Sequence, residues 1–348
     1  MWKSVVALLA ICLSAGCDHD GAWPAVELGQ EAAGEAVRVI YDTDVGDDVD
    51  DALALAMLHA LRARGDCELI GVSVSKPNFY ASAYVDLVNT FYDRRNVPIG
   101  LSRVGSLVGP GPYVGIIATD LTDGLLTYPR RLLEEGQVPE SVEMLRSLLA
   151  AQPDGSVVIV QVGYATNMSR LLDSAPDEHS ELSGYELVEK KVKLLSMMSG
   201  YFGTDLTGFA EHNIRIDIPA AQNVFANWPT PIVVSGWEVG RGILYPARSI
   251  MEDFDYVNRH PIREAYELWN LMPYDRPTYD LTSAIYAVWP ERDLFSLSAP
   301  GRVIVDPDGI TTFQVDPIGR HHYLIVDDAQ RARLSEIFQL LVSEPPHG

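Results

Sequence analysis

The chain has few cysteines, few basic residues and no long apolar run. Its three cysteines among 348 residues are too few for a disulfide framework. Lys and Arg total 26 against 48 Asp and Glu, and the net charge of −22 opposes binding to DNA or RNA. A mean hydropathy near zero excludes a multi-pass membrane protein. What is present, 47% hydrophobic and 21% charged residues, is enough to bury a sizeable core, and the length fits one large α/β unit with short flanks.

The first residues have the composition of an export signal. One cation, Lys3, precedes an apolar run, Val5–Leu13, that is too short for a membrane-spanning helix. The following Leu-Ser-Ala-Gly-Cys17 resembles a bacterial lipobox, in which the cysteine is lipidated and becomes the first mature residue. An ordinary signal peptide with an unrelated Cys17 is the alternative. We therefore predict a lipoprotein signal peptide over 1–16 and a tether over 17–36. The protein would be exported and held by lipid alone on the periplasmic or extracellular face of a bacterial membrane.

From residue 37 onward, short apolar runs alternate with segments that favour helices. The expected strands are Val37–Tyr41, Glu68–Val74, Ser156–Val162, Lys193–Met198 and Thr230–Ser235, and the expected helices are Asp51–Leu61, Ala81–Tyr92 and Met168–Leu172. This alternation predicts an α/β fold with a mostly parallel central sheet flanked by helices. In such sheets ligands bind beyond the carboxyl ends of the strands. Because no repeat or strong boundary interrupts the pattern, we predict one domain over 37–342 and a short tail over 343–348.

An unusually acidic loop follows the first expected strand. Residues 42–51, Asp-Thr-Asp-Val-Gly-Asp-Asp-Val-Asp-Asp, carry six carboxylates in ten positions. Their mutual repulsion is costly unless a cation neutralises it or water solvates it, and helix capping accounts for only one or two of them. Oxygen ligands in this number suit Ca²⁺ or Mg²⁺ rather than zinc. The spacing does not fit an EF-hand, and Gly46 stands where a phosphatase of the haloacid dehalogenase type needs Thr or Val. A divalent-metal site and a solvated acidic turn remain as the two interpretations.

Four further motifs follow the acidic loop in order. They are Leu69-Ile-Gly-Val-Ser-Val-Ser-Lys-Pro-Asn78, Val162-Gly-Tyr-Ala-Thr166-Asn167, Glu211-His-Asn213-Ile214 and Asp280-Leu-Thr-Ser-Ala. The five motifs together, in this order, resemble those of the inosine–uridine-preferring nucleoside hydrolase family. The resemblance extends from about residue 37 to residue 288, most of the mature chain. It implies an enzyme that hydrolyses the N-glycosidic bond of a ribonucleoside or related riboside and releases the free base and ribose.

The resemblance also implies a calcium site and a set of sugar contacts. Ca²⁺ would be held by Asp44, Asp51, Asp280 and the main-chain carbonyl of Thr166, and Asp44 would take the proton of the attacking water. The side chains that would contact the substrate are Asp50, Asn78, Asp205, Glu211, Asn213 and Tyr279. The implied partner is a small nucleoside or riboside. Members of the family are often dimers or tetramers, which predicts a homo-oligomer.

Departures from the family pattern leave alternatives open. The acidic loop is two residues longer than the usual Asp-x-Asp-Pro-Gly-x-Asp-Asp, so a register counted from Asp44 gives the ligand role to Asp48 instead of Asp51. Lys76-Pro77 replaces a Gly-Gly pair. Tyr279 stands where many members have the histidine that protonates the leaving base, and a phenol with a pKa of about 10 is less well matched to neutral pH.

The missing acid leaves other functions open. Other candidates for the acid are Tyr256, Arg259, His260 and Trp269. Two rival functions also remain: a calcium-dependent ribose- or nucleoside-binding lipoprotein without turnover, and a hydrolase of another glycoside.

Overall fold

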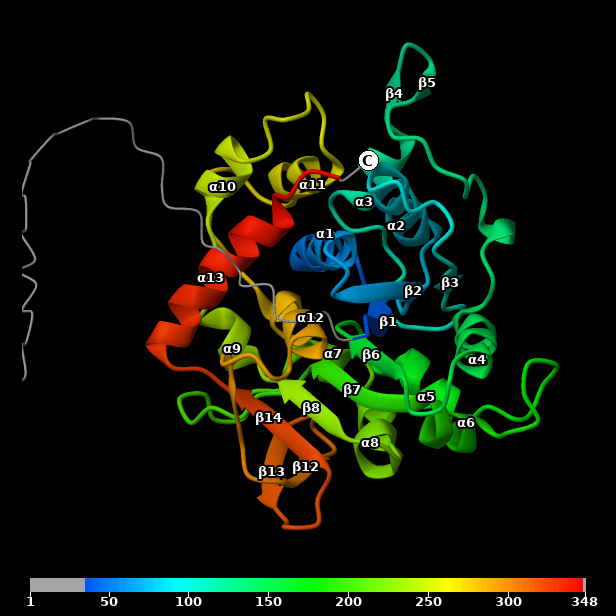
Figure 1. Cartoon of the computed structure of the whole chain (residues 1–348), viewed down its shortest axis with the longest axis vertical. Helices are drawn as coiled ribbons and strands as arrows, with labels where there is room; N and C mark the ends of the chain where they lie inside the picture. The colour runs from blue at the N-terminus through cyan, green and yellow to red at the C-terminus, as the bar shows by residue number, and fades with distance from the viewer. Residues whose placement is uncertain (1–34, 347–348) are drawn as a thin grey trace, which may run out of the picture. The chain divides into compact units, whose positions relative to one another are not determined.

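The computed structural model describes residues 35–346 and contains a ten-stranded sheet with helices on both faces (Figure 1). Its parallel strands lie in the order β3-β2-β1-β6-β7-β8-β14. Their bounds are Ile99–Leu101 (β3), Cys67–Val74 (β2), Val37–Thr43 (β1), Val157–Gln161 (β6), Val192–Met198 (β7), Ile232–Ser235 (β8) and His321–Ile325 (β14). The predicted α/β class with a mostly parallel sheet is confirmed.

One edge of the sheet is antiparallel. There β12 (Gly301–Val305) lies between β14 and β13 (Thr311–Val315), and β11 (Ser296–Leu297) also pairs with β14. Two small hairpins lie apart from the sheet. One joins β4 (Leu121–Thr122) to β5 (Leu125–Leu126), and the other joins β9 (Leu244–Tyr245) to β10 (Arg276–Pro277).

The helices pack in two layers against the sheet (Figure 1). On one face lie α4 (Ser141–Ala151), α5 (Thr166–Leu172), α6 (Gly184–Lys191) and α8 (Ile218–Asn227), and on the other α1 (Asp50–Ala63), α12 (Tyr279–Val288) and α13 (Asp328–Val342). The remaining helices are α2 (Phe79–Phe91), α3 (Val114–Thr119), α7 (His212–Ile216), α9 (Trp237–Arg241), α10 (Ala247–Glu252), α11 (Pro261–Trp269) and a 3₁₀ turn, η1 (Glu135–Gln137).

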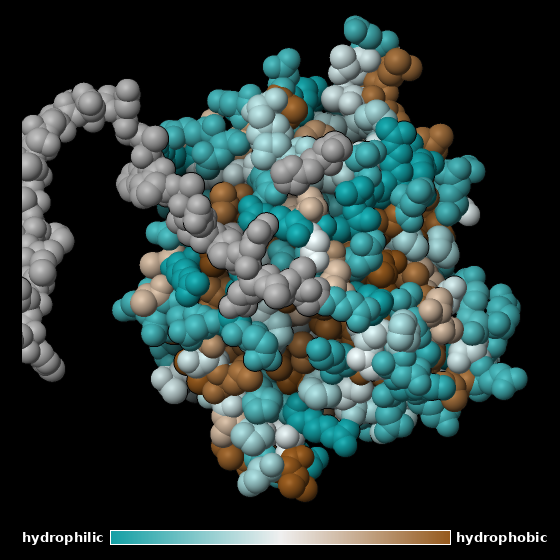
Figure 2. Space-filling model, in the orientation of Figure 1, coloured by the Kyte–Doolittle hydropathy of each residue, from teal (hydrophilic) through white to brown (hydrophobic). Residues whose placement is uncertain are grey.

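Burial explains why these segments form a parallel sheet. Every residue of β6 is buried, as are the last five of β1, because helices cover both faces of the strands. The apolar side chains of β6, β7 and β8 form a core with those of α4, α5 and α8. On the face shown in Figure 2 hydrophilic residues predominate and apolar ones are scattered.

Most element boundaries agree with the sequence prediction, with small differences. Helix α2 begins at Phe79 rather than Ala81 because the Asn78 side chain accepts a hydrogen bond from the N–H of Tyr80 and caps the first turn. The sequence did not predict β3 or the C-terminal strands β12 to β14. The predicted signal peptide, Cys17 and most of the predicted tether lie outside the described residues. Across residues 35–346, no helix combines the length and apolar character needed to cross a membrane.

Candidate functional site

The predicted site residues come from loops at the carboxyl ends of neighbouring strands. The acidic loop follows β1, Lys76 follows β2, and the turn Val162–Ala165 follows β6. The turn approaches the acidic loop so closely that a Cβ on Gly163 would lie 2.7 Å from the backbone nitrogen of Asp44. Only glycine fits this contact without displacement. The sheet therefore brings segments more than a hundred residues apart to one edge, as expected for a ligand site in an α/β sheet.

Asp50, Asp51 and Asp280 form a compact group of buried carboxylates. One oxygen from each lies within 4.8 Å of the others. The backbone N–H of Asp280 donates to Asp50 Oδ2 at 3.1 Å, and the Thr43 hydroxyl donates to Asp51. Burial raises the pKa of Asp50 to about 7, and burial with the neighbouring carboxylates raises the pKa of Asp51 and of Asp280 well above the usual range. Three such groups cannot all be ionised together unless a cation joins them.

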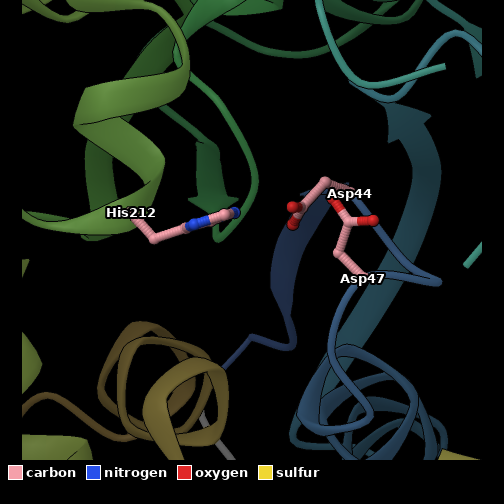
Figure 3. A group of neighbouring side chains, drawn as sticks. All are labelled: Asp44, Asp47 and His212. Carbon is pink, nitrogen blue, oxygen red and sulfur yellow. The ribbon is translucent and has the colours of Figure 1, made fainter. Parts of the chain in front are cut away.

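Asp44 lies beside this group and belongs to a second one. It is buried, and its pKa is raised to about 7, first by burial and then by the charge of Asp47. One oxygen of Asp44, one of Asp47 and a ring nitrogen of His212 lie within 4.8 Å of one another. Figure 3 shows the His212 ring projecting from the start of α7 toward the Asp44 carboxylate. The prediction grouped Asp44 with Asp51 and Asp280; the structure groups Asp50 with those two and places Asp44 next to them.

Two cations neutralise part of the acidic loop. The buried ammonium of Lys76 pairs with Asp47, which also accepts a hydrogen bond from the Tyr164 hydroxyl. Two guanidinium nitrogens of Arg276 pair with the two carboxylate oxygens of Asp48. Asp48, the alternative metal ligand, is thus held by an arginine and belongs to neither carboxylate group.

The remaining carboxylates have no such partner. No ion pair joins Asp44, Asp50, Asp51 or Asp280 to a lysine or arginine within the described residues. The loop therefore separates its acids into neutralised ones and a buried set without a cation. The all-oxygen donor set of Asp44, Asp50, Asp51 and Asp280 fits a hard divalent ion such as Ca²⁺.

Glu211 and Asn213, predicted to contact the sugar, bond to the strand ends. The Glu211 carboxylate caps α7 and accepts the N–H groups of Gly200, Asn213 and Ile214. The Asn213 amide donates to the carbonyls of Val162 and Met198, at the ends of β6 and β7. Burial raises the pKa of Glu211 to about 7. Both side chains fix the edge of the sheet beside the site.

The other predicted contacts differ in exposure. The Asn78 side chain caps α2 and donates to the carbonyl of Val108. Asp205 has a 69% exposed side chain and accepts a hydrogen bond from the Tyr201 hydroxyl. Thr166 is buried at the start of α5, where its hydroxyl donates to Asp217 at 2.5 Å.

Tyr279 opens α12 and is half-buried in a stack of planar groups. Its ring stacks on Trp237 with centroids 6.3 Å apart, and the Arg276 guanidinium lies 5.7 Å from its centroid. Burial raises the pKa of Tyr279 above its usual value. The phenol therefore stays protonated at neutral pH.

The other candidate acids are engaged elsewhere, except for Trp269. Tyr256 hydrogen-bonds His260, which caps α11, and Arg259 pairs with Asp120 and Glu264. The Trp269 indole donates to the Asp47 carbonyl and so contacts the acidic loop. Sequence reasoning missed the roles of Lys76, Tyr164, Trp237 and Arg276. The one available signal was Lys76 itself, a cation in place of a glycine beside an acidic loop.

The fold and site define an α/β protein with a buried group of carboxylates at the carboxyl edge of its sheet. The chain matches the model of the inosine-uridine preferring nucleoside hydrolase family over residues 39–329, and it belongs to that family. It is 30% identical over 213 residues to a pyrimidine-specific ribonucleoside hydrolase of Salmonella paratyphi C, covering 59% of this chain and 61% of that protein. It is 24% identical over 200 residues to an inosine-uridine preferring nucleoside hydrolase of Crithidia fasciculata, covering 56% and 59%. The alignments thus span about three fifths of these relatives.

Solved structures show the same fold over nearly the whole chain. A plant nucleoside hydrolase superposes with a TM-score of 0.66 at 20% identity and covers 89% of this chain and 99% of its own. A purine-preferring ribonucleoside hydrolase from Gardnerella vaginalis has a TM-score of 0.66 at 19% identity and covers 88% and 98%. At this identity the likeness establishes the fold alone.

Proposed function

We propose that the protein is a calcium-dependent hydrolase that cleaves the N-glycosidic bond of a ribonucleoside or related riboside. The observation that carries this proposal is the buried group of Asp50, Asp51 and Asp280 beside Asp44, none of which forms an ion pair with a lysine or arginine of the described residues. Buried charges of one sign need a counter-ion, and the donor atoms suit calcium. Membership in a family of nucleoside hydrolases supports the reaction class.

In this proposal the site residues bind the metal ion and transfer a proton. Asp44, Asp51, Asp280 and the Thr166 carbonyl would hold the ion, and Asp50 completes the buried carboxylate group. A bound calcium ion would hold the 2′ and 3′ hydroxyls of ribose and lower the pKa of the attacking water. Asp44 accepts the proton of that water, while the sugar passes through an oxocarbenium-like state.

Several residues would contact the sugar and the leaving base. Asp50, whose Oδ2 accepts the N–H of Asp280, and Asn78 would hydrogen-bond the ribose hydroxyls. Asp205, Glu211 and Asn213 would contact the far side of the sugar, and Tyr279 would contact the leaving base. Holding the riboside in one orientation supplies several kcal/mol of the barrier, about the range expected for positioning.

Tyr279 is the observation that favours the alternative function, a calcium-dependent nucleoside-binding lipoprotein without turnover. A tyrosine whose pKa is raised by burial is a weak proton donor for a departing base. A leaving group that needs no strong acid, as in another glycoside, would accommodate the same residue.

The test is release of free ribose from a panel of purine and pyrimidine nucleosides, with calcium and after chelation. We expect turnover that chelation abolishes and calcium restores, and a loss of roughly 10²- to 10⁴-fold in kcat for Asp44→Asn. Calcium-dependent binding of nucleosides without ribose release, unchanged in Asp44→Asn, would instead establish the binding protein. Ribose release that survives complete chelation would contradict the calcium requirement.

We also propose that the protein is exported and anchored by a lipid on Cys17, as a homo-dimer or homo-tetramer. The lipobox-like Leu-Ser-Ala-Gly-Cys17 supports the anchor. Cys17→Ser should move the protein from the membrane fraction to the soluble fraction. Unchanged fractionation would refute the anchor and leave the hydrolase proposal intact.

A further inference from the structure

The acidic loop is joined to the segment that leads into α12 by a bidentate ion pair. Arg276 Nε lies 2.9 Å from Asp48 Oδ1, and a second guanidinium nitrogen contacts Oδ2. The two side chains are only 28% (Asp48) and 18% (Arg276) exposed. The guanidinium also lies 4.2 Å from the Trp269 ring centroid, which shields one face of the pair from water. A shielded bidentate pair fixes both distance and orientation, unlike an exposed one.

Two further hydrogen bonds join the same parts of the chain. The Trp269 indole donates to the Asp47 carbonyl at 3.1 Å, and the Asp280 N–H donates to Asp50 at 3.1 Å. Arg276 itself lies in β10, paired with Tyr245 of β9. The segment from Trp269 to Asp280 is therefore held to a hairpin on one side and to the acidic loop on the other.

The opposite side of the acidic loop is held by Tyr113. Its hydroxyl donates to the Asp48 carbonyl at 2.7 Å and accepts the Gly46 N–H at 3.1 Å. Gly46 has a φ of +115°, which a side chain would strain. Tyr113 and Arg276 therefore fix the conformation of the acidic loop, including its two-residue extension. The loop continues directly into Asp50 and Asp51.

The positive charge of Arg276, taken alone, would disfavour calcium binding at the neighbouring site. A guanidinium next to a calcium site repels the ion, so an arginine present only for its charge would weaken metal binding. The geometry of the Arg276–Asp48 pair, in contrast, favours calcium binding. The pair holds Asp50 and Asp51, at the start of α1, at a fixed distance from Asp280, at the start of α12, before any ion binds. Partners that orient metal ligands raise affinity by preorganising them.

We propose that Asp48 and Arg276 are positioning residues that clamp the extended acidic loop onto the segment before α12 and so preorganise the divalent-ion site. The inference rests on the proposed calcium site and assigns its affinity to a pair of residues that do not ligate the ion. It also gives Asp48 a role other than that of a ligand, since its carboxylate bonds to Arg276.

The test measures calcium affinity by titration calorimetry in the full-length protein and in Asp48→Asn, Arg276→Gln and Arg276→Lys. We expect each single variant to raise the calcium Kd by roughly ten- to a hundredfold. The double variant Asp48→Asn/Arg276→Gln should be no worse than either single one, because both remove the same clamp. Turnover in the variants should recover when calcium is raised, which a loss of fold would not allow.

Arg276→Lys separates geometry from charge. It keeps the charge but loses the bidentate pair, so a purely electrostatic role would leave Kd unchanged. The matched control is Arg302→Gln, which removes the ion pair between Arg302, on β12 near the antiparallel edge of the sheet, and Asp316, and should leave Kd unchanged.

Several outcomes would overturn the proposal. If Arg276→Gln binds calcium as tightly as the wild type or more tightly while Asp48→Asn loses affinity, Asp48 is a ligand and the clamp is wrong. Unchanged affinity in both variants also rejects it while leaving the proposed function standing. A wild-type protein that binds no calcium rejects both.

Discussion

At the residue scale, the acidic loop shows that identical side chains acquire different roles from their neighbours. Asp47 and Asp48 are neutralised by Lys76 and Arg276. Asp50 and Asp51 are buried without a paired cation, and their pKa values are raised first by burial and then by the charge of Asp44. The local sequence alone does not separate these pairs, because the two cations come from segments that are distant in the chain.

Tyr279→Phe tests whether the phenol is the proton donor for the leaving group. Because burial raises its pKa and its ring stacks on Trp237, we expect the hydroxyl to contribute little. The predicted result is a kcat within about tenfold of the wild type on nucleosides, measured by ribose release. A loss of roughly 10²- to 10⁴-fold, the size typical of a general acid, would show that Tyr279 replaces the histidine of other family members.

At the element scale, the site depends on how closely the turn after β6 approaches the end of β1. A Cβ on Gly163 would lie 2.8 Å from the Thr43 carbonyl carbon and 2.4 Å from Ser75 Oγ. The turn and the end of β1 therefore meet so closely that no side chain fits on Gly163. Asn167 then bonds both Asp42 and Ser73, across β1 and β2. These contacts set the position from which the acidic loop departs.

Gly163→Ala should displace the end of β1 and with it Asp44. We expect a loss of about 1–3 kcal/mol in the free energy of unfolding, from urea melts, because the added methyl meets backbone atoms. Turnover should fall as well. Gly136→Ala is the matched control, since a Cβ there meets nothing within 4 Å. Equal stability of the two variants would contradict the packing assigned to Gly163.

The strands that could be predicted from sequence are the buried parallel ones. Their continuous apolar runs, such as Val157–Gln161, are a strong signal because both faces are covered. The strands β12 to β14 were not predicted, since none of them has such a continuous buried run and each is partly exposed at the edge of the sheet. The acidic loop and the late Asp280 could be found as motifs. The ion pairs that Lys76 and Arg276 form with this loop could not be predicted, because only the tertiary structure brings the two cations to the loop.

At the scale of the whole molecule, burial disfavours the charged forms of ionisable side chains. Three buried histidines illustrate this effect. Burial lowers the pKa of His59 and of His321 to about 4 and that of His260 to about 3. Each is neutral in the folded protein at neutral pH.

His59 should make stability depend on pH. The unfolded chain binds a proton at His59 near its ordinary pKa of 6.5, whereas the folded chain does so only near 4. Below about pH 6.5 the unfolded state therefore holds more protons at this site, and the contribution of His59 to stability falls as pH falls toward 4, by up to about 1.4 kcal/mol per pH unit. His59→Gln, which keeps a donor for Asn89, should flatten this dependence in urea melts at pH 4 to 7. Parallel curves for the two proteins would refute the assignment.

The measurement that tests the account most directly is the calcium content of the purified protein and of its Asp280→Asn variant, by elemental analysis and calorimetric titration. We expect a single high-affinity ion per chain in the wild type, with protons released on binding because Asp50 and Asp44 have pKa values of about 7 without the ion. Asp280→Asn should lose that ion while remaining folded. A folded wild-type protein that binds no calcium, or a variant that binds it equally well, would contradict the claim that the buried aspartates after β1 form a cation site with Asp280.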